Sequence, residues 1–416
     1  MSDASASVRV DEAQARILEV ITPLAAVELA GARACGRVLA SDVRSLLRLP
    51  EGDVSVMDGF AIRSSDLAET STLEIVGESA AGHPRAGVLS SRQAARISTG
   101  ALVPDGADAV VAIEDCDVAG ERVTIDRQRA GPVRPGHFVR AAGSDVEVDA
   151  LVGRAGELLT PGAVALIESA GHVRIPVHRP PKVAILCSGD ELVPVGAARR
   201  RGQIVSTNGA MLARMVEAAG GVPDELGIAP DRPEPLIDAL ARGLAADVLV
   251  TSGGISVGVH DLVLAGLTAL GLSLRVRKVA LRPGRPLTFG IAQETPVFAL
   301  PGNPASTLVA FELFVRPALA KLSGLPRARW FRPEVTATLT APAPATFGRD
   351  EYLRARVEGS LGGPFLATPL TTQVSGALRS ISGHNALLVR PARSPAAAAG
   401  APARALLLEL PDPPGQ

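Results

Sequence analysis

Between residues 180 and 325, short apolar runs alternate with amphipathic stretches of helical length. The runs KVAILCS, DVLVTS and VFAL each predict a buried strand. The segments NGAMLARMVEAAGG, PEPLIDALARGLAA and PASTLVAFELFVRPALAKLSG each predict a helix, with Gly or Pro at their ends. Strands that alternate with helices in this way predict a doubly wound α/β domain with a parallel sheet over residues 180–325.

The pattern on either side of this domain is different. Residues 46–143 and 326–416 contain short apolar runs broken by glycines and prolines, which predict a β-rich domain and a small C-terminal β-barrel. Val10 to about Ala40 is predicted to be helical, with Pro23 closing its first segment. We therefore expect a multi-domain α/β protein in which residues 1–45 and 144–179 together form an N-terminal linker and dimerisation domain.

The composition narrows the function classes. The 416 residues are 47% hydrophobic and 20% charged, with a net charge of −1, so no basic field exists to hold nucleic acid. No apolar segment reaches the roughly 18–20 residues that a membrane span needs. Three scattered cysteines form no metal or disulfide pattern, which favours a reducing, cytoplasmic location.

Three turns at the predicted strand ends carry polar or cationic groups. TSGGISVG (Thr251–Gly258) follows a strand, and its glycines allow successive N–H groups to form an anion nest. LRPGRP places two arginines on a proline-rigid turn, and PGNPAST opens the next helix. Because ligands bind beyond the carboxyl ends of the strands in open α/β sheets, these turns predict an oxyanion pocket. The alternative is ordinary strand–helix turns with solvated arginines.

Carboxylates occur beside the same turns. Asp190 and Glu191 end the strand of the GDEL segment, where they suggest a metal or a polar head group; a solvated turn is the alternative. Asp261 begins the helix after the glycine-rich turn, as a favourable helix charge or as a ligand for Mg²⁺. The segments SVMDGFAI and RISTGALVPDGADAVV add polar turns whose role cannot be read from physical principles alone.

Taken together, the motifs resemble a known family. SVMDGFAI, ISTGALVPDGADAVV, CSGDEL, STNG, TSGGISVGVHDL, LRPGRPLTFG and LPGNPAST occur in the same order as in molybdopterin molybdenumtransferases. The resemblance implies an elongated homodimer that uses molybdate and adenylylated molybdopterin as substrates and Mg²⁺ as its cation, and yields molybdenum cofactor and AMP. It also implies a site between the α/β domain of one subunit and the β-rich domain of the other. Partners would be molybdopterin adenylyltransferase and other proteins of molybdenum cofactor biosynthesis.

The resemblance assigns roles by position. The residues implied in catalysis are Asp58, Thr99, Glu191, Asp261, Arg282 and Arg285, with Glu191 and Asp261 also holding the cation. The residues implied in binding the substrate are Asp190, Asn208, Asp231, Ser252, Gly253, Gly254, Ser256, Gly258, Pro301, Gly302, Asn303, Pro304, Arg140 and Ser375.

Some positions depart from the family pattern. The family's KPGKP motif is RPGRP here, in a chain with only three lysines, and arginine keeps the positive charge but cannot release a proton. The basic turn that precedes its acidic motif is VRAAGSDV, and Cys187 stands where Ser or Thr is usual. Two other functions stay open: a molybdopterin-binding paralogue that has lost insertion activity, and an adenylyltransferase built on the same α/β domain.

Overall fold

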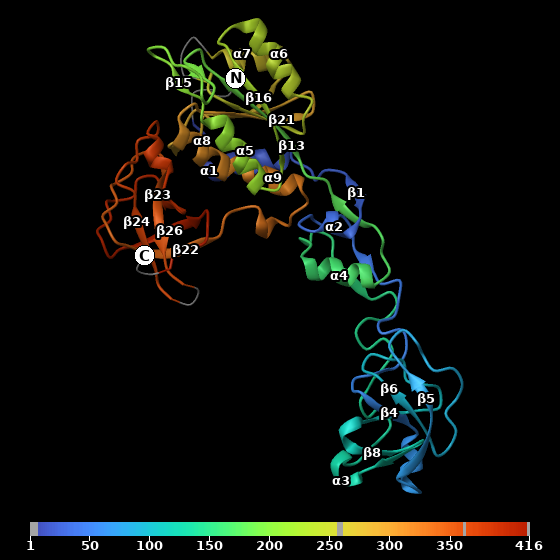
Figure 1. Cartoon of the computed structure of the whole chain (residues 1–416). Coiled ribbons are helices and arrows are strands. Elements are labelled where there is room, and N and C mark those ends of the chain that lie inside the picture. Colours follow the sequence, from blue (N-terminus) through green and yellow to red (C-terminus); the bar gives the residue numbers. More distant parts are fainter. Residues whose placement is uncertain (1–6, 256–260, 361–362, 414–416) are drawn as a thin grey trace. The chain divides into compact units, whose positions relative to one another are not determined.

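A computed structural model describes residues 7–255, 261–360 and 363–413. The chain divides into two compact units, residues 1–27 with 178–416 and residues 28–177. Figure 1 labels the helices and strands of both units.

The first unit contains a six-stranded sheet in the order β16-β13-β17-β21-β20-β18. β16 (Val222–Ala229), β13 (Lys182–Ser188), β17 (Val248–Ser252) and β21 (Thr295–Leu300) are parallel. β20 (Thr288–Ala292) and β18 (Ser273–Arg277) are antiparallel to their neighbours. The expectation of a parallel sheet is therefore wrong at this edge, because β20 and β21 are joined by only two residues. Gln293 and Glu294 both have positive φ, which is the backbone of a tight hairpin turn.

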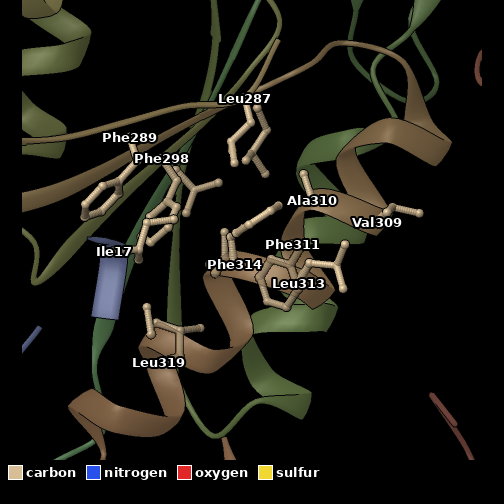
Figure 2. Close-up of a cluster of buried hydrophobic side chains, with 14 of the residues drawn as sticks. Ile17, Leu287, Phe289, Phe298, Val309, Ala310, Phe311, Leu313, Phe314 and Leu319 are labelled. Atoms are coloured by element: carbon tan, nitrogen blue, oxygen red, sulfur yellow. The ribbon is translucent and has the colours of Figure 1, made fainter. Parts of the chain in front are cut away.

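Helices cover both faces of this sheet, as a doubly wound domain requires. α5 (Asn208–Ala218), α1 (Val10–Glu19), α8 (Pro304–Ala310) and α9 (Arg316–Leu322) share one core cluster with Val183 and Ile185 of β13. α6 (Pro233–Gly243) and α7 (Leu262–Ala269) share another with Ala184 and Leu186. Alternate residues of the central strand thus face opposite cores. Figure 2 shows the larger cluster, in which Phe289 and Phe298 of the sheet meet Phe314 of the helical layer.

Two predicted helices are interrupted. The helix expected from Val10 to Ala40 ends at Glu19, and the chain continues into β1 (Ala26–Leu29), which pairs with β12 (Ile175–His178), and into α2 (Gly31–Ala34). Strand pairing overrides the helical pattern after Pro23. The long helix after PGNP contains a π-helical turn, Phe311–Val315, between α8 and α9.

The C-terminal residues form the expected small barrel. β23 (Asp350–Glu358), β24 (Phe365–Pro369), β22 (Glu334–Leu339), β26 (Pro402–Leu407) and β25 (Ala386–Arg390) pair in this order, and β25 returns to β23 to close the barrel. One strand from outside joins it: β19 (Leu281–Arg282) pairs with β23 and so links the RPGRP turn to the barrel.

The second unit is built around a β-rich sheet, as predicted. Its order is β7 (Ala109–Ala112), β4 (Gly59–Ile62), β6 (Gln93–Ile97), β5 (Thr72–Ser79), β9 (Arg122–Ile125) and β8 (Cys116–Ala119). α4 (Pro161–Ser169) is capped by Thr160, whose hydroxyl oxygen accepts from the Ala163 N–H. Other short elements among the described residues include β2 (Val43–Arg44), β3 (Val54–Ser55), α3 (Arg127–Ala130), β10 (Val139–Arg140), β11 (Leu151–Gly153), β14 (Leu192–Val193) and β15 (Ile204–Val205).

Candidate functional site

The predicted turns of the α/β domain lie at one edge of its sheet, where β13, β17 and β21 end. The connection 278–287, which carries RPGRP, reaches the same edge because β18 ends and β20 begins opposite the end of β21. The mixed sheet therefore brings the three polar turns together as a parallel sheet would.

The glycine-rich turn after β17 is held close to β13. Gly253 and Gly254 have φ of 93° and 66°, and a Cβ on Gly253 would collide with the Ser188 carbonyl oxygen. The Gly253 N–H donates to the Leu300 carbonyl at 3.2 Å, so it ties β17 to β21 instead of facing a ligand. The predicted Ser256 and Gly258 lie outside the described residues.

Asn208 at the start of α5 joins the glycine-rich turn to the PGNP turn. Its Nδ2 donates to the Ser252 Oγ at 2.9 Å and to the Gly302 carbonyl at 2.7 Å. Ser252 is 2% exposed and belongs to this buried network. The Asn208 Oδ1 is buried and has no partner within the part of the chain that the structure describes. An acceptor left unsatisfied at a strand-end edge is a candidate contact for a ligand donor.

Acidic side chains gather where β13 and β16 end. The Ser188 hydroxyl donates to Asp231 Oδ1 at 2.7 Å, and the Asp231 N–H donates to Asp190 Oδ1 at 3.0 Å. The Glu191 carboxylate folds back over Gly189, where an added Cβ would collide with it. The three acidic residues implied at this edge, Asp190, Glu191 and Asp231, are thus neighbours.

Asp261 is the N-cap of α7 and accepts a hydrogen bond from the Leu264 N–H at 3.2 Å. Burial raises the pKa of its carboxyl, and the Leu264 N–H and the Arg277 charge oppose that effect. Asp261 therefore caps the helix at the end where a negative charge is favourable, as one of its two interpretations requires. A half-buried carboxylate with a raised pKa is also one that a bound cation would stabilise.

The two arginines of the RPGRP turn have different surroundings. Arg282 Nη1 donates to Glu351 Oε1 of the barrel at 3.1 Å, and Glu351 is buried. Arg285 is exposed, and its carbonyl accepts the Val279 N–H at 2.9 Å. The barrel thus orients one guanidinium, and the other projects into solvent.

The C-terminal loop also reaches the strand-end edge. Asn303 Nδ2 donates to the Ser375 Oγ at 3.1 Å, and the Ala305 N–H donates to the Ser375 carbonyl at 3.1 Å. Ser375 therefore contacts the PGNP turn directly.

Sequence reasoning missed Arg354 of β23. This side chain is 1% exposed, and its Nε donates to the Ser380 carbonyl at 3.0 Å. Its Nη2, the Ser380 Oγ and the His384 Nδ1 are all buried without partners among the described residues. Burial lowers the pKa of Arg354 to about 10, so it stays charged at neutral pH. The only sequence signal was an arginine within the apolar strand EYLRARV.

In the second unit, Asp58 and Thr99 lie together. The Thr99 N–H and hydroxyl donate to Asp58 Oδ1 at 2.6 and 3.0 Å. These two bonds lower the pKa of Asp58, so its carboxylate is charged at neutral pH. Arg140 forms an exposed ion pair with Asp145.

Two further features are absent from the described residues. Across residues 7–255, 261–360 and 363–413, no group of three or more His, Cys, Asp or Glu side chains is placed to hold a metal. In the same ranges, no helix has both the length and the apolar character needed to cross a bilayer.

Three family models match consecutive parts of the chain. The MoeA N-terminal region (domain I and II) matches residues 8–171, a probable molybdopterin binding domain matches 184–321, and the MoeA C-terminal region (domain IV) matches 336–408. The matches to the N- and C-terminal regions disfavour the interpretation as an adenylyltransferase built on the α/β domain alone.

Curated relatives and a solved structure match most of this chain. The molybdopterin molybdenumtransferase of Haemophilus influenzae is 35% identical over 83% of this chain and 84% of its own. The Nostoc sp. protein of the same name is 38% identical over 70% of this chain and 68% of its own. The crystal structure of a molybdopterin biosynthesis MoeA protein from Pyrococcus horikoshii is 30% identical, with a TM-score of 0.85 over 97% of this chain and all of that chain.

Proposed function

Since this chain belongs to the molybdopterin molybdenumtransferase family, we propose that its strand-end edge binds adenylylated molybdopterin and that its arginines present molybdate to it. The products are the molybdenum cofactor and AMP. The observation that carries this proposal is the network in which Asn208 joins the glycine-rich turn to the PGNP turn. It assembles one edge from segments almost a hundred residues apart.

The phosphate-binding role falls mainly on the turn after β17. Ser252 and Gly253 shape the turn, because their polar groups are already bonded within the protein. We assign phosphate binding to Gly254, whose positive φ is the backbone conformation that an anion nest uses. Ser256 and Gly258, which lie outside the described residues, are proposed for the same role, and the N-terminus of α7 favours negative charge beside it.

The acidic side chains at this edge offer the oxygen donors that Mg²⁺ prefers: Asp190, Glu191 and Asp231 lie at the ends of β13 and β16, and burial raises the pKa of Asp261. Among the described residues no three of them are placed to hold an ion together, so the ion would have fewer protein ligands. We propose Glu191 and Asp261 as its protein ligands. A bound Mg²⁺ would neutralise charge on the pyrophosphate linkage that is broken when AMP leaves. The protein's own part is to hold these carboxylates at the edge of the sheet.

Molybdate needs positive charge that is already in place. Arg282 is oriented by Glu351 and Arg285 is exposed, whereas Arg354 is 1% exposed and holds its charge in the interior. We assign molybdate binding to Arg282 and Arg285, because guanidinium groups suit tetrahedral oxyanions and Arg282 is already oriented. The work of the protein is positional and electrostatic.

A second copy of the chain would complete the site. The Asp58–Thr99 pair is a charged, oriented group of the second unit, and we propose that it serves the α/β domain of a partner subunit. An exposed apolar group on the same unit supports dimerisation: Leu46, Leu47 and Val173 are 59%, 50% and 84% exposed. Apolar side chains this exposed mark a candidate contact surface for the second subunit. The four-domain division, the cytoplasmic location and the other enzymes of the pathway as partners stay predictions.

The proposal is tested by reconstituting cofactor from adenylylated molybdopterin with titrated molybdate. The double variant Arg282→Ala with Arg285→Ala should need at least 10-fold more molybdate, while adenylylated molybdopterin still binds, because only the oxyanion loses its countercharge. Arg199→Ala with Arg200→Ala, two exposed arginines of the β14–β15 loop, is the matched control. An unchanged molybdate dependence in the first double variant would refute the arginine assignment, and no cofactor with the wild-type protein would refute the function.

A further inference from the structure

A cavity of about 600 Å³ lies beside the proposed site, on the face of β13 and β16 that α5 partly covers. Asp190 and Gly189 belong both to its wall and to the strand-end edge, so the cavity opens next to the position assigned to the pyrophosphate. Its volume falls within the range of small-molecule sites, roughly 300–1,000 Å³. Apart from Asp190, no residue that lines this cavity has a role in the proposed function.

The walls of the cavity suit a flat ring. Ile185 and Cys187 of β13 form the floor and are buried, and Leu192 and Ile228 add apolar surface at the sides. Burial raises the pKa of the Cys187 thiol, so this side chain is an uncharged part of the floor. Apolar walls with a few polar groups are typical of sites for heterocycles.

The carboxylate of Glu225 in the cavity wall determines which heterocyclic ring can bind. Glu225 lines the cavity, and its Oε2 lies 3.8 Å from the position where a Cβ on Gly209 would be. A carboxylate only accepts hydrogen bonds, so it pairs with a ring edge that carries two adjacent donors. The 2-amino-4-oxopyrimidine edge of a pterin offers an amino group beside an N–H. Adenine sets an acceptor nitrogen beside its amino group, which a carboxylate repels.

We propose that this cavity binds the pterin ring of the substrate, with Glu225 accepting from its amino and N–H donors. This inference rests on the proposed function. It assigns a position to the pterin ring of the substrate and explains why the adenine of the same substrate binds elsewhere. The terminal phosphate of the pterin side chain then leaves the cavity past Asp190 toward the glycine-rich turn.

Two variants test the site in different ways. Glu225→Gln replaces a carboxylate that accepts twice with an amide that also donates. Gly209→Ala puts a methyl group between Cys187 and Glu225, at ordinary contact distances of 3.4 and 3.8 Å, so it fills the cavity without displacing the backbone. Gly209 lies in α5, where alanine is the better helix former, so a loss of binding in this variant cannot be attributed to unfolding. Asp224→Asn, which removes the same charge from the neighbouring residue of β16, is the matched control because Asp224 does not line the cavity.

The experiment is calorimetric titration of the full-length protein with neopterin and, separately, with AMP. We expect Glu225→Gln and Gly209→Ala each to weaken neopterin binding at least 10-fold, with AMP binding and the Asp224→Asn variant unchanged. Wild-type affinity for neopterin in both variants overturns the proposal. Weaker binding of AMP with unchanged binding of neopterin also overturns it, because the cavity would then be an adenine site. Cofactor reconstitution separates this inference from the function: normal turnover and substrate dependence in Glu225→Gln reject only the cavity, whereas inactive wild-type protein rejects the function.

Discussion

At the scale of the residue, the ion pair of Arg179 and Asp247 shows how one carboxylate joins two central strands. The Asp247 oxygens accept from Arg179 at 2.5 and 2.6 Å and from the Lys182 N–H at 2.8 Å. Burial alone would raise the pKa of Asp247, but Arg179 and the Lys182 N–H outweigh burial and hold it below its ordinary value. These bonds fix the starts of β13 and β17, whose far ends carry the site.

The pair predicts a pH-dependent stability. Because the pKa of Asp247 is lower in the folded chain, its stabilising effect is present above the unfolded pKa of about 4 and is lost as the pH falls through the folded value. Asp247→Asn should therefore lower the free energy of unfolding by about 1–3 kcal/mol at pH 7. The difference from wild type should shrink below about pH 4.

Urea denaturation at several pH values measures this effect. The control is Glu217→Gln, which removes an exposed ion pair with Arg214 on α5 and should change stability by less than about 1 kcal/mol. A difference between Asp247→Asn and wild type that stayed constant from pH 7 to pH 3 would contradict the account.

At the scale of the element, the turn after β17 depends on glycine for two separate reasons. Gly253 has a positive φ and also lies against the Ser188 carbonyl oxygen. Gly271 has a similar φ of 86° but nothing within 4 Å of an added Cβ. Comparing substitutions at Gly253 and Gly271 therefore distinguishes the cost of backbone strain from the cost of a steric collision.

Gly271→Ala should cost about 1–2 kcal/mol, the strain of a left-handed residue. Gly253→Ala should cost more and should also weaken binding of adenylylated molybdopterin, because β17 and β13 must separate to admit the methyl group. Thermal denaturation and substrate titration of both variants check this. Equal losses of stability in the two variants would show that the contact with Ser188 is unimportant.

The sequence predicted most elements of the α/β domain because each carries its own periodic pattern and turn residues. It did not predict the antiparallel β20–β21 hairpin, since Gln293 and Glu294 are not typical residues of a tight turn and their positive φ is imposed by the strands they join. The strand-end turns were found from their glycines and charges. Arg354 was not, because its burial depends on barrel closure, and the pairing of Arg282 with Glu351 joins positions 69 residues apart.

At the scale of the whole molecule, the proposed shared site predicts rescue between inactive variants. Asp58→Ala removes the second-unit contribution, and Asp261→Ala removes the α/β contribution. In a mixed dimer, one of the two sites contains both mutated residues and the other contains neither. Random mixing should therefore restore about a quarter of wild-type turnover in a dimer with two shared sites.

The measurement is cofactor formation after the two variants are co-expressed and purified together, with each variant alone as the baseline. Size-exclusion chromatography with light scattering reports the oligomeric state of each sample. A stable mixed dimer without activity would argue that each site is complete within one subunit.

The strand β19 belongs by sequence to the α/β domain and by hydrogen bonding to the barrel. The backbone that carries Arg282 and the carboxylate that orients its side chain are thus both held by β23. Loss of structure in the barrel should therefore also displace Arg282 of the proposed oxyanion site. With Arg282 in the proposed role, a deletion, a protease or heat that loosens the C-terminal strands should lower the affinity for molybdate, whereas the glycine-rich turn stays bonded to Leu300 of β21. We therefore expect molybdate binding to be the first property lost when the C-terminal strands of the barrel unfold.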